Sequence, residues 1–274
     1  MPELPEVETT RRGIAPHLCG QTVAAVTIRA AKLRHPVQPE LCSILPGRTI
    51  EGVERRGKYL LLACGGGTLL IHLGMTGHLR ISPPGTPAGR HDHLEIRLEN
   101  GCLLRLNDPR KFGAVIWLTS DPHSHPLLAG LGPEPLSEDF SPSYLEKITR
   151  RRTVAIKQLI MNSRLLVGVG NIYASEALFR AGINPWLVAG KLSAEQCLIL
   201  CRGIKDVLGE AVARGEKTLH SFYGVSERPV YFDLEARVYV REGEPCLACG
   251  TEIRRELLGG RSTFWCPACQ PLQE

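Results

Sequence analysis

Long apolar runs are missing from this sequence. A membrane-spanning helix needs about 20 consecutive apolar residues, and no run in this chain of 274 residues approaches that length. The first twenty residues carry acids instead of the basic and then apolar pattern of a secretory signal. Internal repeats and long low-complexity segments are missing as well. These absences argue against a membrane, secreted or repeat protein, and we expect a cytoplasmic one.

A strong charge imbalance is also missing. Lys and Arg number 33 against 28 Asp and Glu, which gives a formal net charge of +5. This small excess is compatible with a polyanionic partner but does not demonstrate one. The length allows a sizeable core in one large or two medium domains.

Most of the ten cysteines are scattered among apolar neighbours. In a reducing cytoplasm we expect such residues to be reduced and to lie in the core or on helix faces. They are Cys19, Cys42, Cys64, Cys102, Cys197 and Cys201.

The other four cysteines form the strongest spacing pattern in the chain. Cys246-x-x-Cys249 and Cys266-x-x-Cys269 are separated by sixteen residues, a spacing typical of a zinc ribbon in which a hairpin brings two knuckles together. A disulfide interpretation is weaker in a reducing compartment. We predict one structural Zn²⁺, because four thiolates leave no open position for a substrate. The hairpin tip would present Arg261 outward; such modules bind nucleic acid in some proteins and protein in others.

The chain begins Met1-Pro2-Glu3. Removal of Met1 exposes the secondary amine of Pro2, and an α-amino group titrates near ~8, so part of it is nucleophilic at neutral pH. Its attack on a sugar C1′ gives an iminium that cannot lose an N–H proton and is therefore a strong electron sink. Glu3 is placed to move protons. The alternative is a common Met-Pro start followed by acids, Glu6 among them, that begin an amphipathic helix.

Local patterns divide the chain into a strand-rich half and a helical half. A helix is expected from residue 5 to about Leu18, followed by short alternating strands without intervening helices, which favours an antiparallel sandwich. The strand-like stretches are Thr22–Arg29, Thr49–Cys64, Thr68–Ser82, His93–Leu98 and Cys102–Leu118.

A segment rich in proline and glycine, Leu131–Ser137, then interrupts the strands and is interpreted as an interdomain linker. From Val230 onward we expect strands and turns around the clustered cysteines. The helices expected before them are Ser143–Arg151, Thr153–Met161, Ile172–Ala181 and Ser193–Arg214. The predicted domains are 1–131, 143–229 and 230–274, with a linker at 132–142.

Two glycines, Gly168 and Gly170, precede the expected third helix of this set. Glycine permits close backbone approach, and amides at a helix N-terminus bind phosphate. Asn171 follows them and is either a helix N-cap or a hydrogen-bond donor to phosphate. The upstream run Arg150–Arg152 and Lys157 supply positive charge, although a charge run is usually a solvated face.

Eight separated motifs run along the chain: MPELPEVET at 1–9, ERRGKYLLL around Lys58, IHLGMTG at 71–77, HDH at 91–93, NDPRKFGA at 107–114, LGPEPLS at 131–137, VGVGNIYASEALF at 167–179, and the four-cysteine finger with GRSTFWC at 260–266. Together they resemble the bacterial formamidopyrimidine-DNA glycosylase family over essentially the whole chain. The resemblance implies an α+β multidomain fold: an N-terminal helix plus an antiparallel β-sandwich, a helix-two-turns-helix domain and a C-terminal zinc-finger hairpin, with DNA in the cleft between.

The resemblance also implies a bifunctional DNA glycosylase and abasic-site lyase of base excision repair. It would excise oxidised purines, namely 8-oxoguanine and formamidopyrimidines, through a Schiff base on the N-terminal proline, and then cut the strand by β,δ-elimination. Pro2 would be the nucleophile, Glu3 the acid/base, and Lys58 and Arg261 would assist the two eliminations.

Further residues match the family's DNA contacts. Met75, Arg110 and Phe112 match a trio that fills the hole left by a flipped-out base; from the residues alone, Met75 and Phe112 would more often be core. His72, His91, Arg152, Lys157 and Asn171 match DNA-backbone contacts, and Glu6 and Thr218 are assigned to lesion recognition. The partner would be double-stranded DNA with oxidised bases or abasic sites, bound by a bacterial, nucleoid-associated monomer without a membrane or an obligate protein partner.

The chain departs from the family pattern near the lesion-covering loop. Gly215-Glu-Lys-Thr-Leu219 replaces a Gly-Gly-Thr-Thr/Ser-Leu run, and His220–Val230 differs from the usual Ser-Asp-Gly-x-Pro-Gly run, which opens the choice between 8-oxoguanine and formamidopyrimidines. Alternative functions are an endonuclease VIII-like glycosylase for oxidised pyrimidines and a non-catalytic damage-binding protein. A zinc-ribbon interaction module with unrelated chemistry leaves MPELPEVE unexplained.

Overall fold

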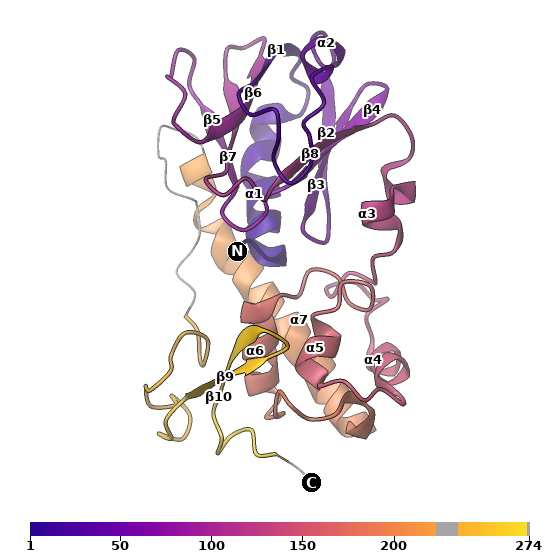
Figure 1. Cartoon of the computed structure of the whole chain (residues 1–274), viewed down its shortest axis with the longest axis vertical. Helices are drawn as coiled ribbons and strands as arrows, with labels where there is room; N and C mark the ends of the chain where they lie inside the picture. Colours follow the sequence, from indigo (N-terminus) through magenta and orange to yellow (C-terminus); the bar gives the residue numbers. More distant parts are fainter. Residues whose placement is uncertain (223–234, 273–274) are drawn as a thin grey trace. The chain divides into compact units, whose positions relative to one another are not determined.

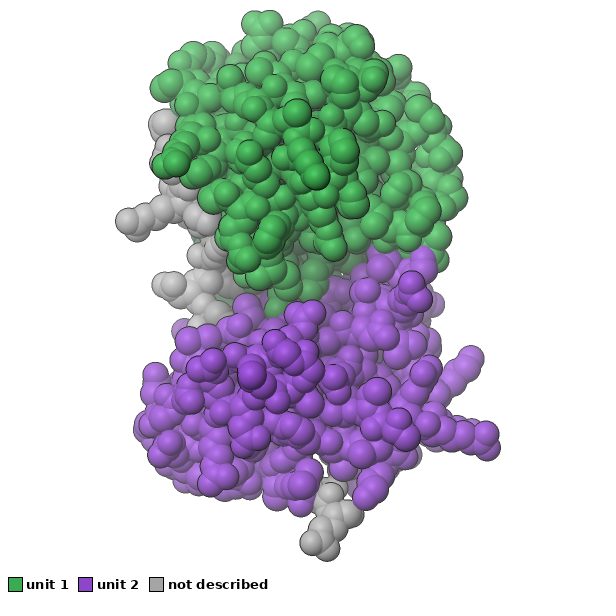
Figure 2. All heavy atoms as spheres, viewed as in Figure 1, with its two compact units in different colours: residues 1–129, 212–232 green, residues 130–211, 233–274 purple. Residues whose placement is uncertain are grey.

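A computed structural model describes residues 1–222 and 235–272 of the chain. Figure 2 colours its two compact units: Met1–Ala129 with Val212–Phe232, and Gly130–Ala211 with Asp233–Glu274. Within the described residues, no helix is long and apolar enough to cross a membrane.

The first unit is built around the N-terminal helix α1, Leu4–Leu18. The expected helix is confirmed, and its apolar residues Val7, Ile14 and Leu18 are fully buried in one core. The core also takes in Phe222, whose ring lies 2.3 Å from where a Cβ on Gly13 would stand. Any side chain on this helix position would therefore displace the Phe222 ring.

The predicted antiparallel strands form two four-stranded sheets, and α1 packs against both (Figure 1). One has the order β1-β6-β7-β5 and the other β2-β3-β4-β8. Helix α1 packs on β2 of one sheet and β5 of the other. The strands are β1 Val23–Ile28, β2 Ile50–Arg56, β3 Tyr59–Cys64, β4 Gly67–His72, β5 His78–Ser82, β6 Asp92–Leu98, β7 Leu103–Asn107 and β8 Ala114–Leu118. Short helices complete the unit: α2 Leu41–Ile44, η1 Pro122–Ser124, α3 Pro126–Ala129 and η3 Leu219–Phe222.

Three of the strand-like stretches each contain two strands. The stretch 49–64 is the β2–β3 hairpin, whose turn contains Gly57 at φ +59° and Lys58. In the other two stretches the chain changes sheets, at residues 73–77 between β4 and β5 and at residues 108–113 between β7 and β8. These two connections run between the same two pairs of strands, because β4 pairs with β8 and β5 pairs with β7. The paired residues at their ends are His72 with Ala114 and His78 with Asn107.

The second unit is helical and ends in a two-stranded hairpin (Figure 1). The four expected helices are present, with ends shifted by a few residues, and the one expected at 153–161 is reduced to five residues. They are α4 Pro142–Thr149, α5 Ile156–Ile160, α6 Asn171–Arg180 and α7 Ala194–Glu216, with a 3-10 turn η2 at Ala189–Lys191. Residues of α7 from Val212 onward belong to the first unit. The hairpin consists of β9 Arg254–Leu258 and β10 Arg261–Trp265.

A buried carboxylate links α6 to the segment that leads into this hairpin. Glu176 is 6 % exposed and accepts backbone N–H groups of Arg237, Val238 and Tyr239 at 2.8–3.0 Å. Gln270 adds a second link, since its amide donates to the carbonyl of Ile183 at 2.8 Å. In both links, hydrogen bonds offset the free-energy cost of burying a charged or polar side chain.

Candidate functional site

The N-terminus is fixed by a reciprocal pair of capping bonds. The backbone N–H of Glu3 donates to Glu6 Oε2 at 2.7 Å, and the Glu3 side chain accepts the backbone N–H of Glu6. This capping box satisfies two amides of the first helical turn. Glu3 is 1 % exposed, so the residue next to Pro2 is a buried acid with a defined orientation.

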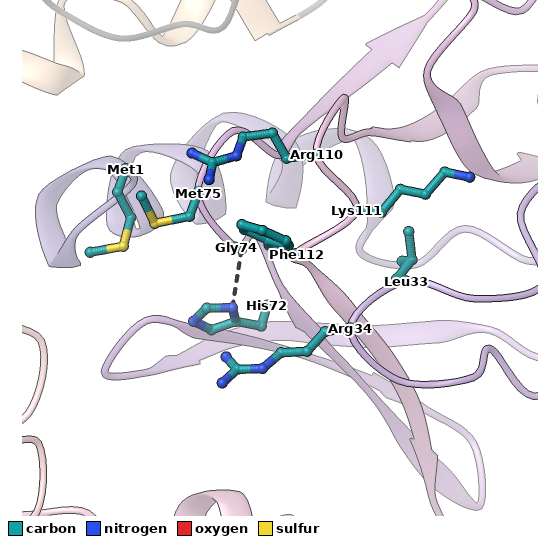
Figure 3. Close-up of a pocket in the computed structure, with 9 residues that line it drawn as sticks. All are labelled: Met1, Leu33, Arg34, His72, Gly74, Met75, Arg110, Lys111 and Phe112. Carbon is teal, nitrogen blue, oxygen red and sulfur yellow. Dashed lines mark hydrogen bonds between the residues drawn. The ribbon is translucent and has the colours of Figure 1, made fainter.

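A cavity of about 600 Å³ lies beside this terminus, and Figure 3 shows the side chains that line it. Met1 lines it, together with four of the predicted site residues: His72, Met75, Arg110 and Phe112. The cavity thus brings residues from two other motifs, IHLGMTG and NDPRKFGA, to the N-terminal residue. Its other lining residues were not predicted from the sequence: Leu33, Arg34, Gly74 and Lys111.

Met75, Arg110 and Phe112, called the wedge residues from here on, are exposed rather than core. Met75 is 38 % and Phe112 45 % exposed, although both are large apolar side chains. The guanidinium carbon of Arg110 lies 4.6 Å from the centre of the Phe112 ring, a cation–π contact. Exposed apolar side chains beside a cation are suited to contact with nucleobases, which offer apolar faces and polar edges.

His72 is held as a neutral imidazole. The backbone N–H of Gly74 donates to its Nδ1 at 3.0 Å (Figure 3), which leaves Nε2 to carry the ring proton. Burial, the largest cause, and the positive charges of Arg34 and Lys58 together lower the pKa of His72 to about 4. Lys58, from the β2–β3 turn, therefore acts electrostatically on the ring. His72 offers a neutral N–H donor next to two cations.

His91 lies just before β6 and is tied to the second connection. Its carbonyl accepts the N–H of Asp108 at 3.0 Å, and its ring centre lies 6.3 Å from that of His93. His93 Nε2 in turn lies 2.9 Å from the Asp108 carbonyl. The HDH motif is thus positioned beside the loop that carries Arg110 and Phe112.

In the second unit, Lys157 and Asn171 converge on the finger hairpin. The Lys157 ammonium donates to Thr263 Oγ1 at 2.9 Å and to the Ser262 carbonyl at 3.3 Å, and Asn171 Nδ2 donates to the same carbonyl at 2.8 Å. Lys157 is 1 % exposed. The helix N-cap is Gly170, and Asn171 is the first helical residue, so the N-cap alternative for Asn171 is wrong.

Arg261 is exposed at the hairpin tip, as expected. Together with Lys157, it lines a second cavity of about 190 Å³. Arg152 is exposed, and its main chain bonds to Thr149 and Gly190. Positive side chains therefore flank the tip of the hairpin and the α5 region of this unit.

Thr218 lies just before η3, and its hydroxyl donates to the Gly215 carbonyl at 2.7 Å. The structure describes the backbone of the predicted lesion-covering loop, His220–Val230, only as far as Phe222. The rest of that loop lies outside the described residues.

The four clustered cysteines have their sulfur atoms within 4.8 Å of one another. Sγ separations of 3.9 Å (Cys246–Cys269) and 3.4 Å (Cys249–Cys266) are too long for disulfides. They bracket the ~3.8 Å edge of a tetrahedron with Zn–S bonds of ~2.3 Å. The residues therefore fit one structural zinc, which would hold the two knuckles and the β9–β10 hairpin together.

Four residues that the sequence did not indicate also belong to the site. Arg34 and Lys111 line the large cavity, while Thr76 and Asp108 bond to each other between the two connections. Lys111 and Asp108 lie inside the NDPRKFGA motif, which could have indicated them. Arg34 lies in no motif, and only the three-dimensional structure brings it to the site.

Three family models match successive parts of this chain. Residues 1–115 match the family described as the formamidopyrimidine-DNA glycosylase N-terminal domain, residues 131–223 its H2TH domain, and residues 243–272 the zinc finger found in FPG and IleRS. The formamidopyrimidine-DNA glycosylase of Geobacter sulfurreducens is 58 % identical over 98 % of this chain and 100 % of its own length.

Solved structures agree. The MutM (Fpg) protein of Thermus thermophilus superposes with a TM-score of 0.84 at 40 % identity, over the full length of both chains. Lactococcus lactis Fpg in complex with DNA containing an abasic site gives a TM-score of 0.88 at 32 % identity, over 99 % of this chain and 100 % of that one. A complex of the same enzyme with Fapy-dG-containing DNA also matches, with a TM-score of 0.88 at 33 % identity over 98 % of this chain and 100 % of that one.

Proposed function

The chain belongs to the formamidopyrimidine-DNA glycosylase family and is a DNA glycosylase of base excision repair, and from this premise we propose that Pro2 is its nucleophile. The observation that carries the proposal is the N-terminus itself: Pro2 lies between Met1, which lines the same cavity as the wedge residues, and Glu3, the buried N-cap of α1. Removal of Met1, which now occupies part of that cavity's wall, frees the Pro2 amine.

The proposed reaction has three stages: release of the base, opening of the sugar ring and cleavage of the strand. The Pro2 nitrogen attacks C1′ of the damaged nucleotide, the C1′–N bond to the base breaks, and the base leaves with a proton. Glu3 protonates the sugar ring oxygen, ring opening gives a C1′ iminium, and the iminium draws electrons from C2′ after loss of a C2′ proton. The 3′ phosphate leaves by β-elimination. Loss of the C4′ proton then supplies the electron pair that expels the 5′ phosphate by δ-elimination, and water releases the sugar fragment from Pro2.

Two cations are assigned to the eliminations. Lys58 assists β-elimination and Arg261 δ-elimination. Lys58 is supported by its effect on His72, a residue of the cavity wall, because the positive charge of Lys58 lowers the pKa of that ring. Arg261 is supported by its exposed position at the tip of the β9–β10 hairpin. A positive charge near a leaving phosphate stabilises the charge that develops there.

The wedge residues are proposed to fill the space that the flipped base leaves. The exposure of Met75 and Phe112 is otherwise unfavourable, because burial of a large apolar side chain is worth roughly 1.5–3 kcal/mol. Insertion into the DNA stack would recover part of this free energy and would offset the cost of unstacking.

The backbone contacts are proposed for His72, His91, Arg152, Lys157 and Asn171. Their support differs. His72 offers a neutral Nε2–H donor, whereas Arg152 offers an exposed charge. Lys157 and Asn171 act in part through the finger, because both donate to Ser262 next to Arg261.

The substrate class proposed is oxidised purine in double-stranded DNA, with Glu6 and Thr218 at the lesion. Glu6 is supported by its bond to Glu3, and Thr218 by its place beside the loop that starts at His220. A monomer without an obligate protein partner suffices for one lesion. Because the substrate is chromosomal DNA, we assign the enzyme to the bacterial cytoplasm, at the nucleoid.

A lesion panel tests this function. Duplexes with one 8-oxoguanine, one formamidopyrimidine, one oxidised pyrimidine or one abasic site are incubated with excess enzyme, and the strand ends are analysed. We expect excision of both purine lesions and fragments with phosphate at both new ends, as β,δ-elimination requires. Preference for the pyrimidine lesion would favour an endonuclease VIII-like enzyme. Tight binding without cleavage would favour a damage-binding protein.

A further inference from the structure

The wedge residues sit on two different connections of the chain. Met75 lies on the first connection, residues 73–77, and Arg110 and Phe112 lie on the second, residues 108–113. Both connections join the same two sheets, side by side. Residues on separate loops would move independently unless something fixes one loop to the other.

A side-chain bridge joins the two connections. The hydroxyl of Thr76, the neighbour of Met75, donates to Asp108 Oδ1 at 2.9 Å. The Thr76 hydroxyl oxygen in turn accepts the backbone N–H of Arg110 at 3.4 Å. Thr76 therefore bonds both to the base of the second connection and to the backbone of a wedge residue.

Asp108 also organises the second connection from within. Its Oδ2 accepts the backbone N–H of Gly113 at 2.8 Å, and its carbonyl accepts the N–H of Lys111 at 3.1 Å. Asp108 is fully buried, and its carbonyl also lies 2.9 Å from His93 Nε2. One buried residue thus closes the turn that presents Arg110 and Phe112.

The backbones of the two connections are in close contact as well. Gly74 has φ +67°, and a Cβ on it would lie 2.4 Å from the carbonyl carbon of Phe112 and 2.5 Å from the nitrogen of Gly113. No side chain fits there. The polar bridge and the glycine contact together leave little room for the two connections to shift.

We propose that Thr76 and Asp108 form a latch, a pair of positioning residues that sets Met75 in register with Arg110 and Phe112 so that the three enter DNA as one unit. The proposal rests on the proposed function of the wedge residues. Ordering two independent loops at insertion costs conformational entropy, and a latch formed before binding removes that cost. Neither latch residue needs to touch the lesion.

Replacing Thr76 by Val tests the latch. Valine keeps the size and branching of threonine and removes only the hydroxyl, whereas Thr76→Ser keeps the hydroxyl. Thr149→Val is the matched control, because Thr149 is a buried threonine of the second unit. Among the described residues, its hydroxyl bonds to backbone carbonyls of its own helix and to a cysteine thiol. Two activities are measured on the full chain: single-turnover excision from an 8-oxoguanine duplex, and borohydride trapping on a single-stranded abasic oligonucleotide.

The two substrates separate positioning from general damage to the enzyme. The single strand has no stacked partner and leaves no hole, so trapping on it does not need the wedge. For Thr76→Val we expect duplex excision to fall about tenfold, the loss typical of one buried hydrogen bond, and single-strand trapping to stay within twofold of the unmodified protein. Thr76→Ser should restore duplex excision to within threefold, and Thr149→Val should leave both rates unchanged.

Three outcomes would overturn the latch: duplex excision by Thr76→Val at the unmodified rate, an equal fall on both substrates, or failure of Thr76→Ser to restore excision. If the unmodified protein forms no adduct on the single strand, the proposed function itself fails. That result is distinct, because it appears without any substitution in the latch.

Discussion

The ammonium of Lys157 lies 2.9 Å from the hydroxyl of Thr263, and this bond joins helix α5 to strand β10 of the finger hairpin. Lys157 is 1 % exposed and Thr263 fully buried. A buried ammonium costs free energy unless its donors are paired. The contact therefore holds β10, the strand that begins at Arg261, against α5.

Thr263→Val removes this acceptor while it keeps the side-chain volume. We expect the free energy of unfolding to fall by about 1–3 kcal/mol, because the ammonium loses a partner in a buried place. Chemical denaturation measures the loss, with Thr263→Ser as the control that keeps the hydroxyl. Equal stability of the Val variant and the unmodified protein would show that the bond contributes nothing.

The zinc site gives a second prediction. Cys249→Ser should lower the metal content well below the one zinc per chain expected of the unmodified protein, because serine is a poor zinc ligand. The tryptophan emission should change as well, since the rings of Trp186 and Trp265 lie 4.5 Å apart beside the finger. Cys42→Ser is the control, because Cys42 is exposed and outside the cluster. Full zinc occupancy in Cys249→Ser would contradict a four-thiolate site.

The neutral state of His72 gives a pH dependence of stability. Burial and the positive charges of Arg34 and Lys58 lower the pKa of His72 from 6.5 to about 4, so between these values the unfolded chain binds a proton that the folded protein does not. Stability from this residue is therefore present above about pH 6.5 and is lost as the pH falls toward 4, by at most about 3 kcal/mol.

His72→Asn tests this dependence, since an amide oxygen can still accept the Gly74 N–H. Unfolding free energies are measured for both proteins at pH 7.5, 5.5 and 4.5. We expect the unmodified protein to lose more stability between pH 7.5 and 4.5 than the variant. Parallel curves for the two proteins would mean that His72 titrates normally in the folded state.

A glycine pair separates steric contact from backbone strain. Gly74 and Gly85 have φ angles of +67° and +75°, but a Cβ on Gly85 would meet no atom within 4 Å, whereas one on Gly74 would strike the Phe112 backbone. We expect Gly74→Ala to slow single-turnover excision at least tenfold and Gly85→Ala to change it less than twofold. Similar rates for both variants would show that the close approach of the two connections is unimportant. Alanine in the left-handed region costs about 1 kcal/mol of backbone strain at either position, so a difference between the two variants reports the steric contact alone.

Local chemistry in the sequence was sufficient to predict the zinc cysteines, the first helix and the antiparallel strands. Each depends on spacing or on periodicity within one short segment. The exposure of Met75 and Phe112 could not be predicted in the same way. Both residues lie on connections between strands, and their exposure depends on how the flanking strands pair. Likewise, Asn171 finds its partner Ser262 ninety-one residues away, and the bond between Thr76 and Asp108 follows from the pairing of four strands.

The sheet changes illustrate the same limit. The stretch 68–82 is strand-like in composition on both sides of its turn, and composition contains no information about which sheet each half joins. The turn residues Gly74 and Gly77 mark the break, but only the pairing of β4 with β8 and β5 with β7 brings the wedge residues together. The resemblance to a known family predicted their shared role, and the structure supplies the contacts that position them.

The central claim is that the amine of Pro2 forms a covalent bond to the damaged sugar. Borohydride trapping on a duplex with one 8-oxoguanine, followed by mass mapping of the cross-linked peptide, measures this bond directly. Hydride reduces the iminium to a stable amine, and the account predicts an adduct on Pro2 that disappears in a form of the protein that retains Met1. An adduct on a lysine, or an undiminished adduct when Met1 is retained, would contradict it.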